Sequence, residues 1–247
     1  MGSNDGPVAI ITQANDYVGP ALSRVMGRSG FRLVLHGAGD QLIESLAADD
    51  IEASTANGDL TTADGNRALV ASTLDRYGRI DAACYVTGVI VPATFLDTTA
   101  EQWQFLQRVN LDAVFHALQA VLPPMAEAGT GQVVVFTSAA GARNLRGAAA
   151  YSATRAGANA VVRAAAQDVA DRGVCVNAIG TNFMDFPAFL RASGADDPKV
   201  RPEVEKRVPL RRLGTMEELA EFAAVLLDGR SRFQTGQFFS YSGGWST

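Results

Sequence analysis

The sequence predicts an α/β fold in which one doubly wound parallel sheet is flanked by helices on both faces. Short apolar runs alternate with amphipathic runs along all 247 residues, as expected of strands that alternate with helices. The apolar runs, such as "VAIIT" at residues 8–12, are continuous, which indicates strands that are buried on both sides. We therefore expect a single Rossmann-like domain over residues 1–247, with ligands at the carboxyl ends of the strands.

Each element follows from its own signal. The expected strands are "VAIIT" (8–12), "FRLVLHG" (31–37), "IEAST" (51–55), "IDAACYVTG" (80–88), "GQVVVFTSAAG" (131–141), "GVCVNAIG" (173–180) and "GQFFSYSGG" (236–244). The expected helices cover residues 20–30, 41–48, 62–77, 101–125, 151–172 and 215–227. Pro123 and Pro124 are expected to stop the fourth helix, and Thr215 with Glu218 forms a capping-box pattern at the start of the last. Residues 181–209 show no clean period and predict an irregular insertion over the substrate and halide pocket.

The composition excludes several classes of function. Lys and Arg number 21 against 26 Asp and Glu, a formal net charge of −5, whereas a nucleic-acid partner would require a concentrated basic patch. His36 and His116 share no ligand spacing, so no metal site is expected. Cys84 and Cys175 lie in apolar strands and are expected to be buried free thiols. No apolar leader is visible at residues 1–7 and no run could span a membrane, which predicts a cytoplasmic protein.

The first turn after a strand reads "TQANDYVGP", residues 12–20. A turn that cradles a dinucleotide is rich in glycine, because its backbone must come close to the pyrophosphate. Here only Gly19 remains, while Gln13 and Tyr17 bring side chains to positions where bare backbone is needed and Asp16 adds a negative charge. We therefore expect no cofactor, with Tyr17 as the wall of a smaller site. The alternative is a divergent turn that still binds a dinucleotide.

A second turn follows the sixth expected strand, in "AIGTNFMDF" at residues 178–186. Successive backbone amides at Thr181 and Asn182 could form a concave nest for an anion. Apolar and polarisable side chains would surround it, from Phe183, Met184, Phe186 and Phe189. This environment would suit a weakly hydrated monoanion better than a phosphate. In the alternative interpretation the aromatic side chains simply pack the loop against the domain.

Three polar residues form a candidate catalytic set. Tyr151 and Arg155 are four residues apart at the start of a helix, so their side chains lie on one face. The permanent charge of Arg155 and the positive end of the helix would both favour the phenolate form of Tyr151. Ser138 ends the fifth expected strand, so its hydroxyl would emerge at the ligand-binding edge beside that helix. The conjunction predicts acid–base chemistry with Tyr151 as the proton-transfer group.

These residues resemble the catalytic set of the short-chain dehydrogenase/reductase superfamily, a serine followed by Tyr-x-x-x-Lys, and the resemblance extends over the whole chain. Arg155 stands in place of the lysine, and Thr12-x-x-x-x-Tyr17-x-Gly19 in place of the glycine-rich turn. Together these two departures resemble the halohydrin dehalogenases (haloalcohol dehalogenases), which share the fold but use no nicotinamide. Asn110 matches the asparagine of the dehydrogenase proton relay and is expected to be a structural remnant.

The resemblance implies a carbon–halide lyase that converts vicinal halohydrins to epoxides with release of halide and a proton. It also implies the reverse opening of epoxides by azide, cyanide or nitrite. Ser138 and Tyr151 would bind the substrate oxygen, and Arg155 would hold Tyr151 ready to take the hydroxyl proton. The halide or nucleophile would contact Tyr17, Thr181, Asn182, Phe183 and Met184. The substrate would contact Phe186, Phe189 and Trp245, in a homotetramer.

Two alternatives of other classes stay open. One is an atypical NAD(P)-dependent short-chain dehydrogenase/reductase, which binding of nicotinamide would favour. The other is a non-catalytic binding protein of the superfamily, which would release no halide from any halohydrin.

Overall fold

The computed structural model describes residues 6–246, so the prediction that no leader is present falls largely on residues 1–5, outside the described part. Seven strands form one parallel sheet in the order β3-β2-β1-β4-β5-β6-β7. They are β1 (Val8–Ile11), β2 (Arg32–His36), β3 (Ala53–Ala56), β4 (Ala82–Val86), β5 (Gly131–Ser138), β6 (Val174–Thr181) and β7 (Phe238–Tyr241). The strand order reverses between β1 and β4, the point at which doubly wound sheets open a ligand crevice.

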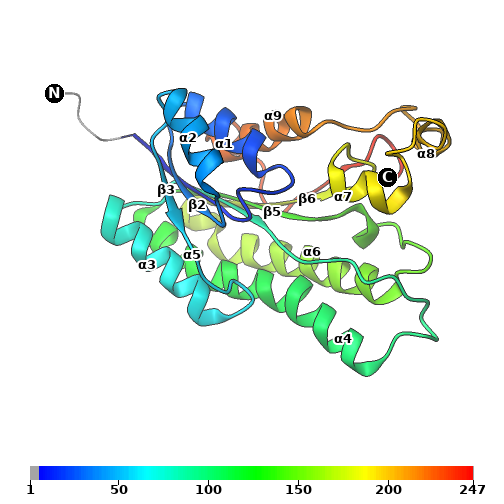
Figure 1. Ribbon diagram of the computed structural model, residues 1–247. Coiled ribbons are helices and arrows are strands. Elements are labelled where there is room, and N and C mark those ends of the chain that lie inside the picture. Colours follow the sequence, from blue (N-terminus) through cyan, green and yellow to red (C-terminus); the bar gives the residue numbers. More distant parts are fainter. Residues whose placement is uncertain (1–5, 247) are drawn as a thin grey trace.

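Helices cover both faces of the sheet, which confirms the predicted fold class (Figure 1). One face carries α1 (Gly19–Arg28), α2 (Asp40–Ala48) and α9 (Met216–Leu227). The other carries α3 (Ala63–Tyr77), α4 (Ala100–Gln107), α5 (Ala113–Ala128) and α6 (Ala149–Val169). A separate cluster of buried side chains fills each of the two interfaces between sheet and helices. The sheet is therefore buried on both sides, as its continuous apolar strands predict.

Two local predictions differ from the structure. Helix α5 continues through Pro123 and Pro124 to Ala128 and ends at Gly129, whose φ is 70°. The prolines lack the N–H groups that would donate hydrogen bonds within the helix, and this loss is offset because Leu122 and Met125 keep this part of the helix packed in the core. Residues 181–209 are more regular than expected, since they contain α7 (Pro187–Ser193) and α8 (Arg201–Glu205).

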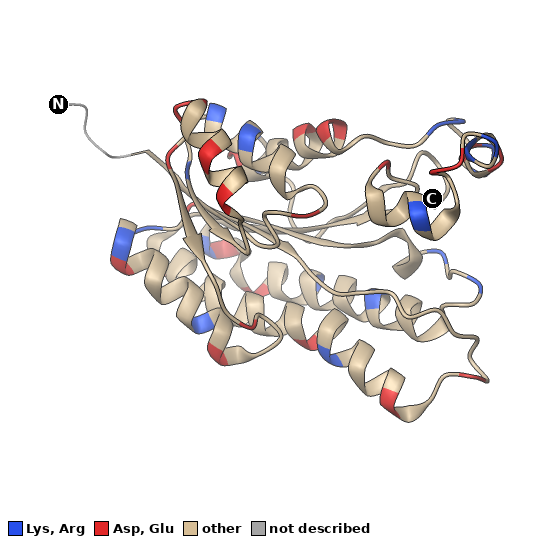
Figure 2. Cartoon of the chain, in the orientation of Figure 1, with Lys and Arg blue, Asp and Glu red and all other residues tan. Residues whose placement is uncertain are grey.

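Helices α7 and α8 lie beyond the carboxyl ends of the strands, at the end of the molecule where the chain also finishes (Figure 1). A small third cluster of buried side chains holds this region together: Phe183, Ala195, Val204, Val208 and Leu213. Basic and acidic residues are interspersed over the helices (Figure 2). Helices α7 and α8 thus lie over the carboxyl edge of the sheet, where a ligand is expected.

Candidate functional site

Ser138 and Thr181 stand side by side where the two longest strands end, at the carboxyl edge of the sheet. They are register partners on β5 and β6. The Ser138 side chain is buried, with its Oγ donating to the Thr181 carbonyl at 3.5 Å and accepting from the Ala140 amide at 3.1 Å. The contact to Thr181 is long, so we expect the hydroxyl to be able to turn toward a substrate oxygen.

Tyr151 lies in the first turn of α6 and is half-buried. The Arg155 guanidinium carbon lies 5.4 Å from the centroid of the Tyr151 ring, so the two side chains meet on one helix face as their spacing predicts. Within residues 6–246, the Tyr151 hydroxyl has no hydrogen-bond partner. A half-buried phenol without a partner, beside a fixed cation and a helix N-terminus, is well suited to exchange a proton with a ligand.

Tyr17 fills the space beside this set. Its hydroxyl donates to Thr181 Oγ1 at 2.7 Å, and its ring packs edge-on against Phe136 and Phe186 with centroids 6.1 and 4.8 Å away. Burial raises the pKa of the Tyr17 hydroxyl above its ordinary value, and the hydrogen bond to Thr181 opposes only part of that shift. Tyr17 is therefore a neutral donor fixed at the carboxyl ends of β5 and β6.

The residues of the first turn do not fit a dinucleotide in this conformation. Gln13 and Tyr17 have φ values of 49° and 52°, so the backbone keeps a turn suited to glycine while carrying two large side chains. The amides of Ala14, Asp16 and Gly19 donate to carbonyl oxygens of the chain, at 2.9 to 3.1 Å, rather than toward an open cradle. The ring of Tyr17 occupies the space between the turn and β5. Both backbone and side chains therefore oppose a pyrophosphate at this turn.

The predicted anion nest after β6 is not open. The Asn182 amide donates to the Tyr241 carbonyl at 3.4 Å, the Phe183 amide to Asn182 Oδ1 at 2.9 Å, and the Asp185 amide to the Gly214 carbonyl at 2.8 Å. Phe183 and Met184 are buried against the domain. The packing alternative describes this segment better, because its amides are used to attach it to β7 and to the residues before α9.

The predicted substrate-pocket aromatics form a continuous chain of ring contacts. Phe186 stacks on Phe189 at 6.3 Å, Phe189 meets Phe183 at 5.8 Å, and Phe183 meets Trp245 at 5.8 Å between ring centroids. Trp245 also lies under the Arg143 guanidinium at 4.8 Å, and its carbonyl accepts from Arg143 at 2.5 Å. These contacts anchor the carboxyl-terminal residues on their own domain. The chain of rings begins at Tyr17, so it can form one apolar wall of the site.

The other sequence predictions concern metals and membranes. In the part of the chain that the structure describes, no group of three His, Cys, Asp or Glu side chains could hold a metal ion. Cys84 and Cys175 are free and buried. Among residues 6–246 no helix is both long and apolar enough to cross a membrane.

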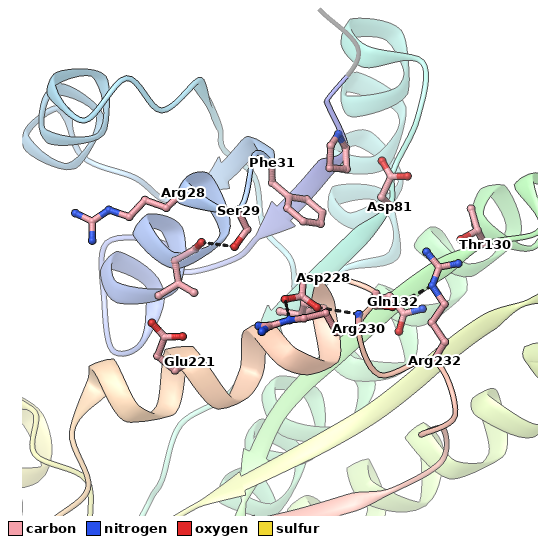
Figure 3. A pocket seen from close by; sticks show the side chains of 14 residues that line it. Arg28, Ser29, Phe31, Asp81, Thr130, Gln132, Glu221, Asp228, Arg230 and Arg232 are labelled. Atoms are coloured by element: carbon pink, nitrogen blue, oxygen red, sulfur yellow. Dashed lines mark hydrogen bonds and ion pairs between the residues drawn. The ribbon is translucent and has the colours of Figure 1, made fainter.

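A cavity of about 690 Å³ lies at the opposite, amino-terminal edge of the sheet, between the ends of α1 and α9 (Figure 3). Most of its charged side chains already have partners: Arg230 pairs with Asp228 at 2.5 Å, and Asp81 with Arg79 at 2.6 Å. Ser138, Tyr151 and Arg155 do not line it. We therefore assign the candidate site to the carboxyl edge, where the acid–base residues meet.

The turn after β4 also belongs to the site, a role that the sequence did not predict. Arg155 donates to both the carbonyl and the hydroxyl of Thr87, the latter at 3.3 Å. Asn110, which was expected to be a structural remnant, binds Val89, two residues after Thr87. Its side-chain oxygen accepts from the Val89 amide, and its side-chain nitrogen donates to the Val89 carbonyl. The available signal was position, because Thr87 directly follows a strand at the point where the strand order reverses.

Comparison with known proteins is consistent with this fold. Residues 14–246 match the family described as enoyl-(acyl carrier protein) reductase. The oxidoreductase UcpA of Salmonella typhimurium is 31% identical over 96% of this chain and 93% of its own length. The 3-oxoacyl-[acyl-carrier-protein] reductase of Synechocystis is 30% identical over 96% of each chain. The structure of an actinorhodin polyketide ketoreductase variant with NADPH superposes with a TM-score of 0.91 and 26% identity, covering both chains fully.

These comparisons correct the functional prediction. A halohydrin dehalogenase, a carbon–halide lyase that acts on halohydrins and epoxides, was expected from Arg155 and Tyr17. That expectation is wrong, because the relatives matched over nearly the whole chain are named as reductases and oxidoreductases. Two substitutions within the superfamily's motifs therefore did not suffice to assign the reaction. The chain belongs to the short-chain dehydrogenase/reductase superfamily, in the family described as enoyl-(acyl carrier protein) reductase.

Proposed function

We propose that the protein is an atypical oxidoreductase of this superfamily that acts on a hydroxyl or carbonyl group of a small organic molecule. The observation that carries the proposal is the contact of Arg155 with the Tyr151 ring at the start of α6, a helix that packs against the turn directly following Ser138. Ser138 would bind the substrate oxygen, and Tyr151 would donate a proton to it or remove one from it. Arg155 cannot give up its proton, so its contribution would be a fixed positive charge.

A nicotinamide dinucleotide is the proposed partner of the reaction, since NADPH is named with the polyketide ketoreductase. When bound, it would supply the hydride chemistry. The first turn does not fit the dinucleotide in the conformation described, so binding would require the Tyr17 ring to leave its contacts with Phe136 and Phe186. This requirement is what makes the proposed enzyme atypical. The aromatic wall from Phe186 to Trp245 would favour apolar substrates.

A cytoplasmic homotetramer remains the proposed assembly. Helices α5 and α6 flank an apolar groove of about 510 Å³, and Phe115 on α5 is 49% exposed. An apolar face of this kind is suited to contact with a second copy of the chain.

The proposal is tested by the oxidation of NADH and NADPH with a panel of small ketones, and by the reverse reaction with the matching alcohols. Tyr151→Phe should lower turnover by about a hundredfold or more, because the proton donor is lost. Tyr77→Phe is a matched control, since within residues 6–246 the Tyr77 hydroxyl binds only Ser54, at 3.2 Å, on the edge strand β3, away from β5 and β6. Equal turnover in both variants would contradict the assignment of Tyr151. Ligand binding without turnover would instead favour a binding protein.

A further inference from the structure

We propose that the turn Thr87–Val89 holds Arg155 against Tyr151, and that Thr87 is therefore a positioning residue of the site. The inference rests on the proposed function, in which Tyr151 exchanges the proton. It concerns how the buried guanidinium of Arg155 is kept in one orientation beside the phenol of Tyr151.

Arg155 is a buried charge that lacks the usual partner. Its residue is only 4% exposed, yet no Asp or Glu among residues 6–246 forms an ion pair with it. Its hydrogen bonds go to the Thr87 carbonyl and to Thr87 Oγ1, the latter at 3.3 Å, while its Nε is buried and has no partner in the described part of the chain. A buried cation is costly unless its donors are satisfied, so the two oxygens of Thr87 carry most of this task.

The absence of a carboxylate from this contact has an electrostatic consequence. An Asp or Glu at position 87 would also fix the guanidinium, but it would cancel its charge. A carbonyl and a hydroxyl are neutral acceptors, so they orient Arg155 and leave its full charge to act on Tyr151. The Thr87 contact therefore combines fixed geometry with an uncompensated positive charge.

Gly88 makes this turn possible. Its φ of 82° lies in the left-handed region, and a Cβ atom there would overlap Asn110 Oδ1 and lie 2.7 Å from Arg155 Nη2. Only glycine therefore lets the chain pass close enough to the guanidinium for Thr87 to reach it.

Asn110 fixes the other end of the turn. The Val89 amide donates to Asn110 Oδ1 at 2.9 Å, and Asn110 Nδ2 donates to the Val89 carbonyl at 3.0 Å and to Thr154 Oγ1 at 3.3 Å. Asn110 is fully buried on a π-helical turn, Arg108–Asp112, and Thr154 precedes Arg155 on α6. Through Asn110 the turn is thus attached to α6, the helix that carries Tyr151 and Arg155. We therefore expect the turn and these two side chains to keep their relative positions.

The first test compares Thr87→Val with Thr87→Ser. Valine keeps the shape and the backbone carbonyl but removes Oγ1, so kcat for the ketone reaction should fall by about tenfold with an unchanged KM. Serine keeps the hydroxyl and should restore kcat to within a factor of about two. The matched control is Thr73→Val, because it likewise removes a threonine hydroxyl that makes a hydrogen bond, in this case to the Leu69 carbonyl at 2.8 Å, but on α3. A raised KM with normal kcat in Thr87→Val would overturn the proposal.

The second test does not depend on turnover. In nitrogen-15 NMR spectra of arginine-labelled protein, an anchored guanidinium should give resolved Nη resonances, assigned to Arg155 by their loss in Arg155→Gln. We expect these resonances in the wild type and in Thr87→Ser, and their collapse in Thr87→Val at an unchanged melting temperature. A wild-type protein whose Arg155 rotates freely would overturn the proposal, even if Thr87→Val failed to fold. Failure of the proposed function would show separately, as normal turnover in Tyr151→Phe while the Arg155 resonances stay resolved.

Discussion

At the scale of single residues, Tyr17 is the side chain that we expect to oppose a dinucleotide most strongly. A tyrosine at a φ of 52° is strained by about 1–3 kcal/mol, and this strain persists because the ring gains contacts with Phe136 and Phe186. Tyr17→Gly removes the ring and the strain together. We expect the variant to bind NADPH about tenfold more tightly than the wild type, or better, as measured by quenching of protein fluorescence.

Two further variants show whether tighter NADPH binding in Tyr17→Gly comes from the loss of the ring or from the relief of backbone strain. Gln13→Gly relieves the same kind of backbone strain at an exposed side chain, where φ is 49°, and should bring a smaller gain. Tyr17→Phe keeps the ring but loses the bond to Thr181, and should bring none. A wild type that binds NADPH as tightly as Tyr17→Gly would show that the ring is no obstacle.

The same scale shows which site residues the sequence could reveal. Tyr151 and Arg155 were predictable because helical spacing alone brings them together. Thr87 was not, since it acts partly through its backbone carbonyl, which every residue possesses. The closed nest at Asn182 and Phe183 was also hidden, because its amides are taken up by partners such as the Tyr241 carbonyl on another strand.

At the scale of elements, the start of α9 gives a stability prediction with a defined pH window. Glu218 and Thr215 form a reciprocal capping box, and Arg212 pairs with Glu218 at 2.7 Å. The Arg212 guanidinium, with a smaller contribution from the Thr215 amide, lowers the pKa of the Glu218 carboxyl from 4.5 to about 2. A lowered pKa means that the carboxylate stabilises the fold above its unfolded pKa, and that this stabilisation is lost as the pH falls toward 2.

Glu218→Gln should therefore lower the free energy of unfolding at neutral pH by at most about 1 kcal/mol, because the pair is largely exposed. The difference from the wild type should shrink between pH 4.5 and about pH 2, as followed by urea denaturation at each pH. Glu217→Gln changes an exposed carboxylate in the same turn and should show no such narrowing. A difference that is independent of pH would exclude the charge as its cause.

The elements themselves were predictable where burial imposed a pattern. The central strands were found because burial on both faces favours apolar side chains over most of their length. The end of α5 was misplaced because the energetic balance at Pro123 depends on the packing of Leu122 and Met125, which becomes visible only in three dimensions. The short helices α7 and α8 were missed since five to seven residues carry too little periodicity to recognise.

At the scale of the whole molecule, the proposed tetramer can be separated from the fold. Phe115→Lys places a charge on the apolar face of α5 and α6, so we expect smaller species in sedimentation velocity with unchanged circular dichroism. Val225→Lys is the matched control, since Val225 is 38% exposed on α9, on the opposite side of the sheet. If Val225→Lys dissociates the protein and Phe115→Lys does not, the interface lies on the other face.

The two buried cysteines have a practical consequence for fluorescent labelling of the protein. Cys84 is fully buried and Cys175 is 7% exposed, and burial raises the pKa of the Cys84 thiol well above its ordinary value. A shielded thiol that stays protonated reacts slowly with maleimides. Dyes can therefore be attached to a single introduced cysteine, for example at Leu96, which is 93% exposed, without first replacing the native thiols.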